Sequence, residues 1–292
     1  MKRILSIVLL LGLVTILALW LREPNENEPA TIVCKGADSL IQLSLAWAES
    51  FKGVNPKVNI VATGGGSGTG IAELIKGGAQ ICFSVREMRN DEREQFRAKF
   101  GEDPTPILIC FQALAIYIHP TNPLHEIPIG DLREIWAEGG KVDTWDQLKG
   151  GGSGPIVRFG SPAGTGSFGY FRDMICGNDA KGRSREFKPG MSEFVGMSEV
   201  VEHISKTPNS VCYAAPGYKT PGVKWLAISG ESGGKAELPN EDAVRQGLYP
   251  LNRRCYVYVV GKPTGSIRVF LDWIVGVEGQ KFAKQLGFIS LH

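Results

Sequence analysis

The sequence has little of the chemistry on which enzymes and metal sites depend. It contains four histidines in 292 residues, and none lies in an HExxH motif or a triad-like local pattern. Its six cysteines form no CxxC pair and no Cys/His spacing that suits zinc. Ser167 stands in Gly166-Ser167-Phe168-Gly169, which is not the full GxSxG nucleophile elbow. We therefore expect no enzymatic activity, no bound metal and no cofactor.

An excess of charge and an internal repeat are also missing. The formal net charge is only +2, so the composition gives no reason to expect a nucleic-acid partner. No segment recurs at a solenoid period. The chain is 43% hydrophobic, which is enough for one large core or for two lobes.

The cysteines are best explained as small buried side chains. Five of the six lie inside apolar, strand-like runs, which predicts burial rather than reactivity. The sequence does not say whether their thiols are free or partly paired. These five are Cys34, Cys82, Cys110, Cys212 and Cys255.

Residues 1–30 are expected to be a signal or anchor segment with a tether. Lys2 and Arg3 precede a nearly all-apolar run over 4–21, at the border between the core of a signal peptide and a spanning helix. No small-x-small cleavage site follows it. We expect export to the periplasm or another extracytoplasmic space. Retention as a membrane anchor and cleavage both stay open.

A glycine-rich stretch over 63–70 (TGGGSGTG) stands between an apolar strand pattern over 58–62 and a helical pattern over 71–76. Glycine lets backbone N–H groups approach a ligand closely, and a helix N-terminus attracts anions. GxxxxGK[ST] is absent, so the stretch is not a nucleotide P-loop. Read alone, it fits either an anion site or a flexible turn.

The remaining elements alternate between strand and helix patterns, which predicts an α/β sheet with ligands at the carboxyl ends of its strands. The apolar run 107–118 is too long for one simple strand, and we expect it to cross between two lobes. A second loop over 160–167 again joins a strand to a helix pattern. Two such loops facing each other predict an anion-binding cleft. The polar stretch 229–242 predicts a long loop, and 267–286 predicts a helix interrupted near Gly276 and Gly279.

These segments together resemble the phosphate-binding proteins of bacterial ABC phosphate importers. The similarity runs in order from about Val33 to Leu291. It includes GADSLIQLSLAWAESF, TGGGSGTGIAEL, AQICFSVREM, IGDLREIWAEGGKVDTWDQLKGG, SVCYAAPGY and GLYPLNRRCYVYV. The resemblance implies a two-lobed type II periplasmic-binding-protein fold with the ligand cleft between the lobes. One lobe is expected over 31–119 plus 222–292, and the other over 120–221.

The resemblance also implies the ligand-binding residues, which are mostly hydroxyls and backbone amides at loop ends. Two positions depart from the family pattern: Val85 replaces a serine, and Ser161 stands where many relatives carry an arginine. Arg86 or Arg158 could supply the missing charge. The alternative for Arg86 is an ion pair with Glu87, Asp91 or Glu94. The expected ligand-binding residues are Ser39, Leu40, Ser67, Ser84, Arg86, Thr165, Gly166 and Ser167.

The function implied is that of an exported solute-binding protein. We expect a monomer that captures inorganic phosphate, or a related tetrahedral oxyanion, and delivers it to an ABC permease. The departures at Val85 and Ser161 leave a second hypothesis open, a membrane-anchored oxyanion sensor or scaffold with a drifted site. An exported hydrolase is disfavoured because no nucleophile, base and metal set is visible.

Overall fold

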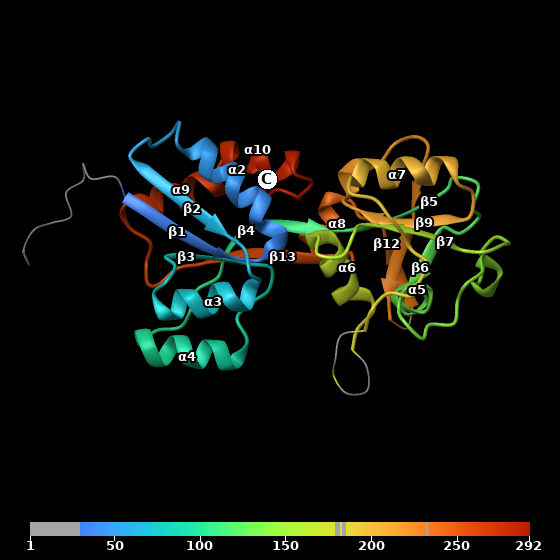
Figure 1. Cartoon of the computed structure of the whole chain (residues 1–292), viewed down its shortest axis with the longest axis horizontal. Helices are drawn as coiled ribbons and strands as arrows, with labels where there is room; N and C mark the ends of the chain where they lie inside the picture. The colour runs from blue at the N-terminus through green and yellow to red at the C-terminus, as the bar shows by residue number, and fades with distance from the viewer. Residues whose placement is uncertain (1–29, 179–181, 183–184, 232) are drawn as a thin grey trace, which may run out of the picture.

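The protein folds into two α/β lobes that lie side by side (Figure 1). The computed structural model describes residues 30–178, 182, 185–231 and 233–292. The expected signal or anchor segment falls almost wholly on residues 1–29, outside the described residues. In the described ranges, none of the helices combines the length and the apolar character that crossing a bilayer requires.

The first lobe is built on a five-stranded sheet with the order β2-β1-β3-β13-β4. β1 pairs in parallel with β2 and β3, whereas β13 runs antiparallel to β3 and β4. α2, α9 and α10 cover one face, and α3 and α4 cover the other (Figure 1). The bounds are β1 Ala30–Gly36, η1 Asp38–Leu40, α2 Ile41–Phe51, β2 Val58–Thr63, α3 Ser67–Lys76, β3 Ile81–Ser84, α4 Asn90–Phe100, β4 Ile107–Ala113, β13 Asn252–Tyr258, α9 Gly265–Val275 and α10 Val277–Gln285.

The second lobe contains a five-stranded sheet, β10-β5-β9-β7-β8, and a three-stranded sheet, β12-β11-β6. An aromatic cluster fills its core: the Phe171 ring stacks 4.0 Å from that of Tyr213, and Trp136 meets both rings edge-on. The bounds are β5 Ala115–Ile118, β6 Glu126–Pro128, α5 Ile129–Trp136, η2 Trp145–Gln147, β7 Val157–Gly160, α6 Gly166–Ile175, β8 Ser192–Glu193, α7 Met197–Lys206, β9 Ser210–Ala214, η3 Pro216–Tyr218, β10 Lys224–Trp225, β11 Ala227–Gly230, β12 Gly233–Glu237 and α8 Glu241–Arg245.

The long apolar run crosses between the lobes, as predicted. It divides at Leu114 into β4 of the first sheet and β5 of the second. The chain returns at β13, after β10, β11 and β12 have joined the second lobe. By sheet membership, residues 115–118 and 224–237 therefore belong to the second lobe, so the expected boundaries at 119 and 222 do not coincide with the crossovers. The first crossover lies at Leu114, between β4 and β5, and the second lies between β12 and β13.

Two other expectations have opposite outcomes. The helical region near the C-terminus breaks at Gly276 into α9 and α10, as predicted. The expected long loop over 229–242 is wrong, because it contains β12 and the start of α8. Gly233 and Gly234 open β12 with φ of 90° and 103°, and Gly230 of β11 pairs with Gly233 in this antiparallel pair.

All six cysteines are buried and free, so the thiols are not partly paired in disulfides. Burial raises the pKa of the Cys34 and Cys82 thiols to about 12. Because the thiolate is the reactive form, these side chains serve as packing groups and not as nucleophiles.

Candidate functional site

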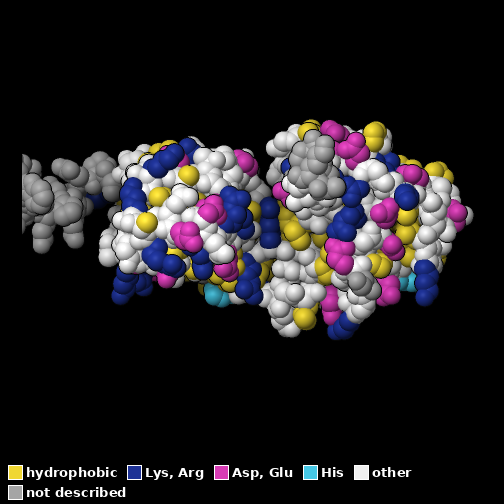
Figure 2. Space-filling model, turned by 90° about the horizontal axis from the view of Figure 1, so that it is seen from below, with side chains coloured by type: hydrophobic (Ala, Val, Ile, Leu, Met, Phe, Trp, Pro, Cys, Tyr) yellow, Lys and Arg dark blue, Asp and Glu magenta, His cyan; other side chains and the backbone are white. Residues whose placement is uncertain are grey.

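A cavity with a volume of about 690 Å³ lies between the lobes. Figure 2 shows the gap between the two lobes, with Lys and Arg side chains near its rim. The first turn of α3 lines one side and the first turn of α6 lines the other. Of the expected ligand-binding residues, five line this cavity: Ser39, Ser67, Arg86, Thr165 and Gly166.

The first-lobe wall is a helix N-terminus that begins earlier than the sequence pattern predicts. α3 starts at Ser67 and not near residue 71, so two of the loop glycines belong to the helix. A Cβ on Gly70 would lie 2.7 Å from the Cα of Gly36, which explains how the helix can pack so closely on β1. The first-turn N–H groups of such a helix have no intrahelical acceptor and can bind an anion. The Ser67 hydroxyl accepts a hydrogen bond from the Val85 N–H at 3.2 Å, and its own proton remains free to donate.

The second-lobe wall is the N-terminus of α6, which begins at Gly166. Thr165 is its N-cap: the hydroxyl accepts from the Phe168 N–H at 3.3 Å and donates to the Pro162 carbonyl at 2.9 Å. This hydroxyl proton is therefore already used. A Cβ on Gly166 would stand 2.8 Å from the Cα of Ser39, so the two lobes touch at this point. Glycine makes that contact possible.

Three of the expected residues lie apart from the main cavity. Leu40 is 1% exposed in the core of the first lobe, and its N–H donates to the Ala37 carbonyl at 3.0 Å. Ser84 is fully buried, and its hydroxyl donates to the Arg86 carbonyl at 2.6 Å. Ser167 lines a smaller neighbouring cavity of about 270 Å³, with its hydroxyl 3.0 Å from that of Ser161. Leu40 and Ser84 are thus buried residues of the first lobe that do not line the main cavity.

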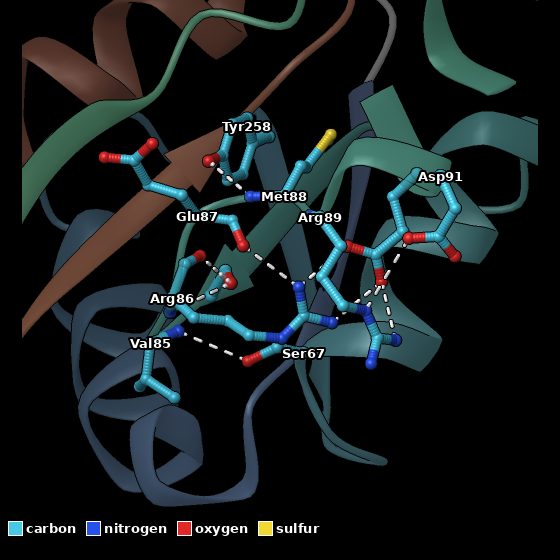
Figure 3. A network of polar contacts seen from close by, with 10 residues as sticks. Ser67, Val85, Arg86, Glu87, Met88, Arg89, Asp91 and Tyr258 are labelled. Atoms are coloured by element: carbon cyan, nitrogen blue, oxygen red, sulfur yellow. Dashed lines mark hydrogen bonds and ion pairs between the residues drawn. The ribbon is translucent and has the colours of Figure 1, made fainter. Parts of the chain in front are cut away.

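Arg86 is held by a buried carboxylate (Figure 3). Its Nη1 and Nη2 donate to the two oxygens of Glu92, each at 2.7 Å, and Arg89 donates to the same carboxylate. Burial raises the pKa of Glu92, but the hydrogen bonds from Arg86 and Arg89 outweigh it and bring the pKa to about 2. The expectation of an ion pair was correct in kind but wrong in partner. Glu92, which lies between the expected candidates Asp91 and Glu94 on α4, neutralises Arg86.

Arg158 does not approach the cavity. Its guanidinium donates to the backbone carbonyls of Ile135 and Pro189 and to the carboxylate of Asp143, at 3.2–3.4 Å. It is not among the cavity-lining residues. Arg158 therefore does not supply a positive charge to this cavity.

Arg253, which the sequence reasoning missed, lines the cavity from β13. Its Nε and Nη2 donate to Oε1 of Gln112 at 2.8 and 2.6 Å, and Nη2 also donates to the Ser39 hydroxyl at 2.8 Å. The guanidinium carbon lies 3.8 Å from the ring centroid of Tyr170. The available signal was a pair of arginines at the start of an apolar strand, because alternation sends Arg253 and Arg254 to opposite faces.

Comparisons with known proteins agree with this architecture. Residues 23–278 match the model of the PBP superfamily domain. The chain is 32% identical to the phosphate-binding protein PstS of Pseudomonas aeruginosa over 88% of this chain and 81% of that protein. It is 28% identical to the phosphate-binding protein PstS of Bacillus subtilis, over 88% of this chain and 79% of that protein.

Solved structures show the same fold. A possible phosphate binding protein from Planctomyces limnophilus superimposes with a TM-score of 0.79 at 22% identity, covering 91% of this chain and 94% of that one. An ABC-type phosphate transport receptor from Vibrio cholerae gives a TM-score of 0.72 at 20% identity, covering 88% and 99%. The chain thus belongs to the PBP superfamily and, within it, to the family of phosphate-binding proteins of ABC importers, with the type II periplasmic-binding-protein fold.

Proposed function

We propose that this chain captures phosphate, or an oxyanion of the same shape, in the cavity between its lobes and delivers it to an ABC permease outside the cytoplasm. The observation that carries the proposal is the meeting of two helix N-termini, α3 from the first lobe and α6 from the second, at one cavity. An anion bound there receives donors from both lobes, and lobe closure around it is thereby stabilised.

The donors proposed to hold the ligand are small and compatible with one another. Ser39 and Ser67 offer hydroxyl protons, and Gly166 and its neighbours in the first turn of α6 offer backbone N–H groups. A dehydrated oxyanion needs many donors and little bulk, which this set supplies. Thr165 acts as a cap that orients α6, and Leu40 and Ser84 act as wall supports.

Asp38 favours phosphate over sulfate as the ligand. Its carboxylate lines the cavity, and one oxygen accepts from the Gly65 N–H at 2.7 Å. A carboxylate repels an anion that carries no proton, but it can accept a hydrogen bond from hydrogen phosphate. Sulfate is fully ionised at neutral pH and cannot donate. Asp38→Asn is accordingly expected to reduce the preference for phosphate over sulfate by about tenfold, roughly one charged hydrogen bond.

Calorimetric titration of the purified full chain in mild detergent tests the proposal. Phosphate, arsenate, sulfate and molybdate are titrated separately at neutral pH. Saturable binding of phosphate and arsenate, with sulfate weaker, is the expected result. Absence of binding by all four at millimolar concentration would instead favour the sensor or scaffold, a reading consistent with the neutralised Arg86 and with Ser161.

A further inference from the structure

Arg253 stands where the two lobes and the crossover strands meet. It pairs with Gln112 in the β13–β4 register, so the two side chains share one face of the sheet. Ser39 reaches it from the first lobe and Tyr170 from α6 of the second. A guanidinium fixed by a two-point contact to an amide and by stacking on an aromatic ring has little freedom left to lose on binding.

The three arginines of the cavity wall differ in how their charge is balanced. Arg86 is matched by Glu92. Arg172 lies 3.1 Å from Asp173 and 3.2 Å from Glu186. Arg253 has no ion pair with any carboxylate of the described residues, and the partners that hold it, Gln112 and Ser39, are neutral. Of the three arginines, Arg253 is therefore the one whose charge is not balanced by an ion pair with a carboxylate of the described residues.

The hydrogen bonds of the Arg253 guanidinium also indicate that it can bind a ligand. Nε and Nη2 are committed to protein acceptors, whereas Nη1 has no acceptor among residues 30–178, 182, 185–231 and 233–292. Burial lowers the pKa of Arg253, yet arginine remains charged at any physiological pH. A partly desolvated charge without a counter-ion is costly unless a ligand supplies one. An oxyanion bound in the cavity would do so.

We propose that Arg253 is the cationic ligand-binding residue of this site, with Gln112 and Tyr170 as the residues that position it. The proposal rests on the function proposed above. Arg253 then supplies the positive charge of the cavity from strand β13 of the first lobe. Nη1 donates to one ligand oxygen, and the hydroxyl of Ser39, which accepts from Nη2 of Arg253 and keeps its own proton, donates to another.

The test is Arg253→Gln with Arg254→Gln as its matched control. Arg254 is the exposed neighbour on the same strand, so the control removes the same charge one residue away. Phosphate titration by calorimetry is expected to show a loss of at least about thirtyfold for Arg253→Gln and less than about twofold for Arg254→Gln. Arg253→Lys keeps the positive charge but not the planar guanidinium, and its phosphate affinity should lie between those of the two Gln variants. Equal affinity of Arg253→Gln and the unmodified chain would overturn the proposal.

Two measurements keep the outcomes separate. If the unmodified chain binds none of the four oxyanions, the proposed function fails; if it binds phosphate but Arg253→Gln binds equally well, only the role of Arg253 fails. Should Arg253→Gln not fold, as judged by its thermal melt, Gln112→Glu makes the same test. It leaves Arg253 in place but gives it a carboxylate, so unchanged affinity in a folded Gln112→Glu variant would also refute the proposal.

Discussion

Arg86 and Arg253 line the same cavity, yet the protein treats their charges in opposite ways. Arg86 follows β3, and Arg253 opens the neighbouring strand β13. Each is held by two short hydrogen bonds to one side chain, Glu92 in the first case and Gln112 in the second. The geometry is similar, but a carboxylate cancels the charge it holds, whereas an amide only orients it. The position of an arginine on a binding wall therefore does not reveal whether its charge is available.

Converting Gln112 into a carboxylate should make Arg253 resemble Arg86. We expect Gln112→Glu to weaken phosphate binding by about a hundredfold, equivalent to about 2.7 kcal/mol, because the new carboxylate neutralises Arg253 and repels the ligand. The free energy of unfolding should not fall. Calorimetry and chemical denaturation measure the two effects. A folded variant with full affinity would mean that the charge of Arg253 plays no part in binding.

Removing the carboxylate from the other pair tests what Glu92 contributes. Glu92→Gln should lower the free energy of unfolding by about 2 kcal/mol at pH 7, since Arg86 and Arg89 lose a charged acceptor. Glu94→Gln, an exposed change on the same helix, is the matched control.

The pH dependence of that difference has a defined sign. The pKa of Glu92 is about 2 in the folded protein, below the value of about 4.3 expected for an unfolded chain. Its contribution is therefore complete above about pH 5 and is lost as the pH falls toward 2. Denaturation of the unmodified chain and Glu92→Gln should converge near pH 2. A constant gap between them from pH 7 to 2 would contradict the ion-pair origin.

The sequence predicted the parts of the site that depend on local pattern. Two strand–loop–helix units and the crossover within 107–118 follow from apolar periodicity and glycine placement, and the structure has each of them. The starts of α3 and α6 were placed too late. Small residues are compatible with both a loop and a helix first turn, and only packing against β1 or η1 selects the helix.

The electrostatics of the site could not be read from the chain. Arg253 and Gln112 are 141 residues apart and meet only through the β4–β13 register. Glu92 carries the same charge as the candidates Glu87, Asp91 and Glu94, and the turn that follows β3 decides which of them Arg86 reaches. The same limit applies to the lobe boundaries, since the pairing of β10–β12 with strands far earlier in the sequence sets them.

The same contrast applies to the hydroxyls of Ser67 and Thr165, because one has a proton free for the ligand and the other does not. The effects expected on phosphate affinity are the smallest of those predicted here. The Ser67 hydroxyl has a proton free to donate, whereas the Thr165 hydroxyl donates its proton to the Pro162 carbonyl. Ser67→Ala should weaken phosphate binding by about tenfold with little change in stability. Thr165→Ala should cost about 1 kcal/mol of stability as a lost helix cap and change affinity by less than about threefold. Each variant is the control for the other in calorimetry and thermal melts. A larger affinity loss for Thr165→Ala than for Ser67→Ala would mean that the threonine hydroxyl leaves Pro162 when the ligand binds.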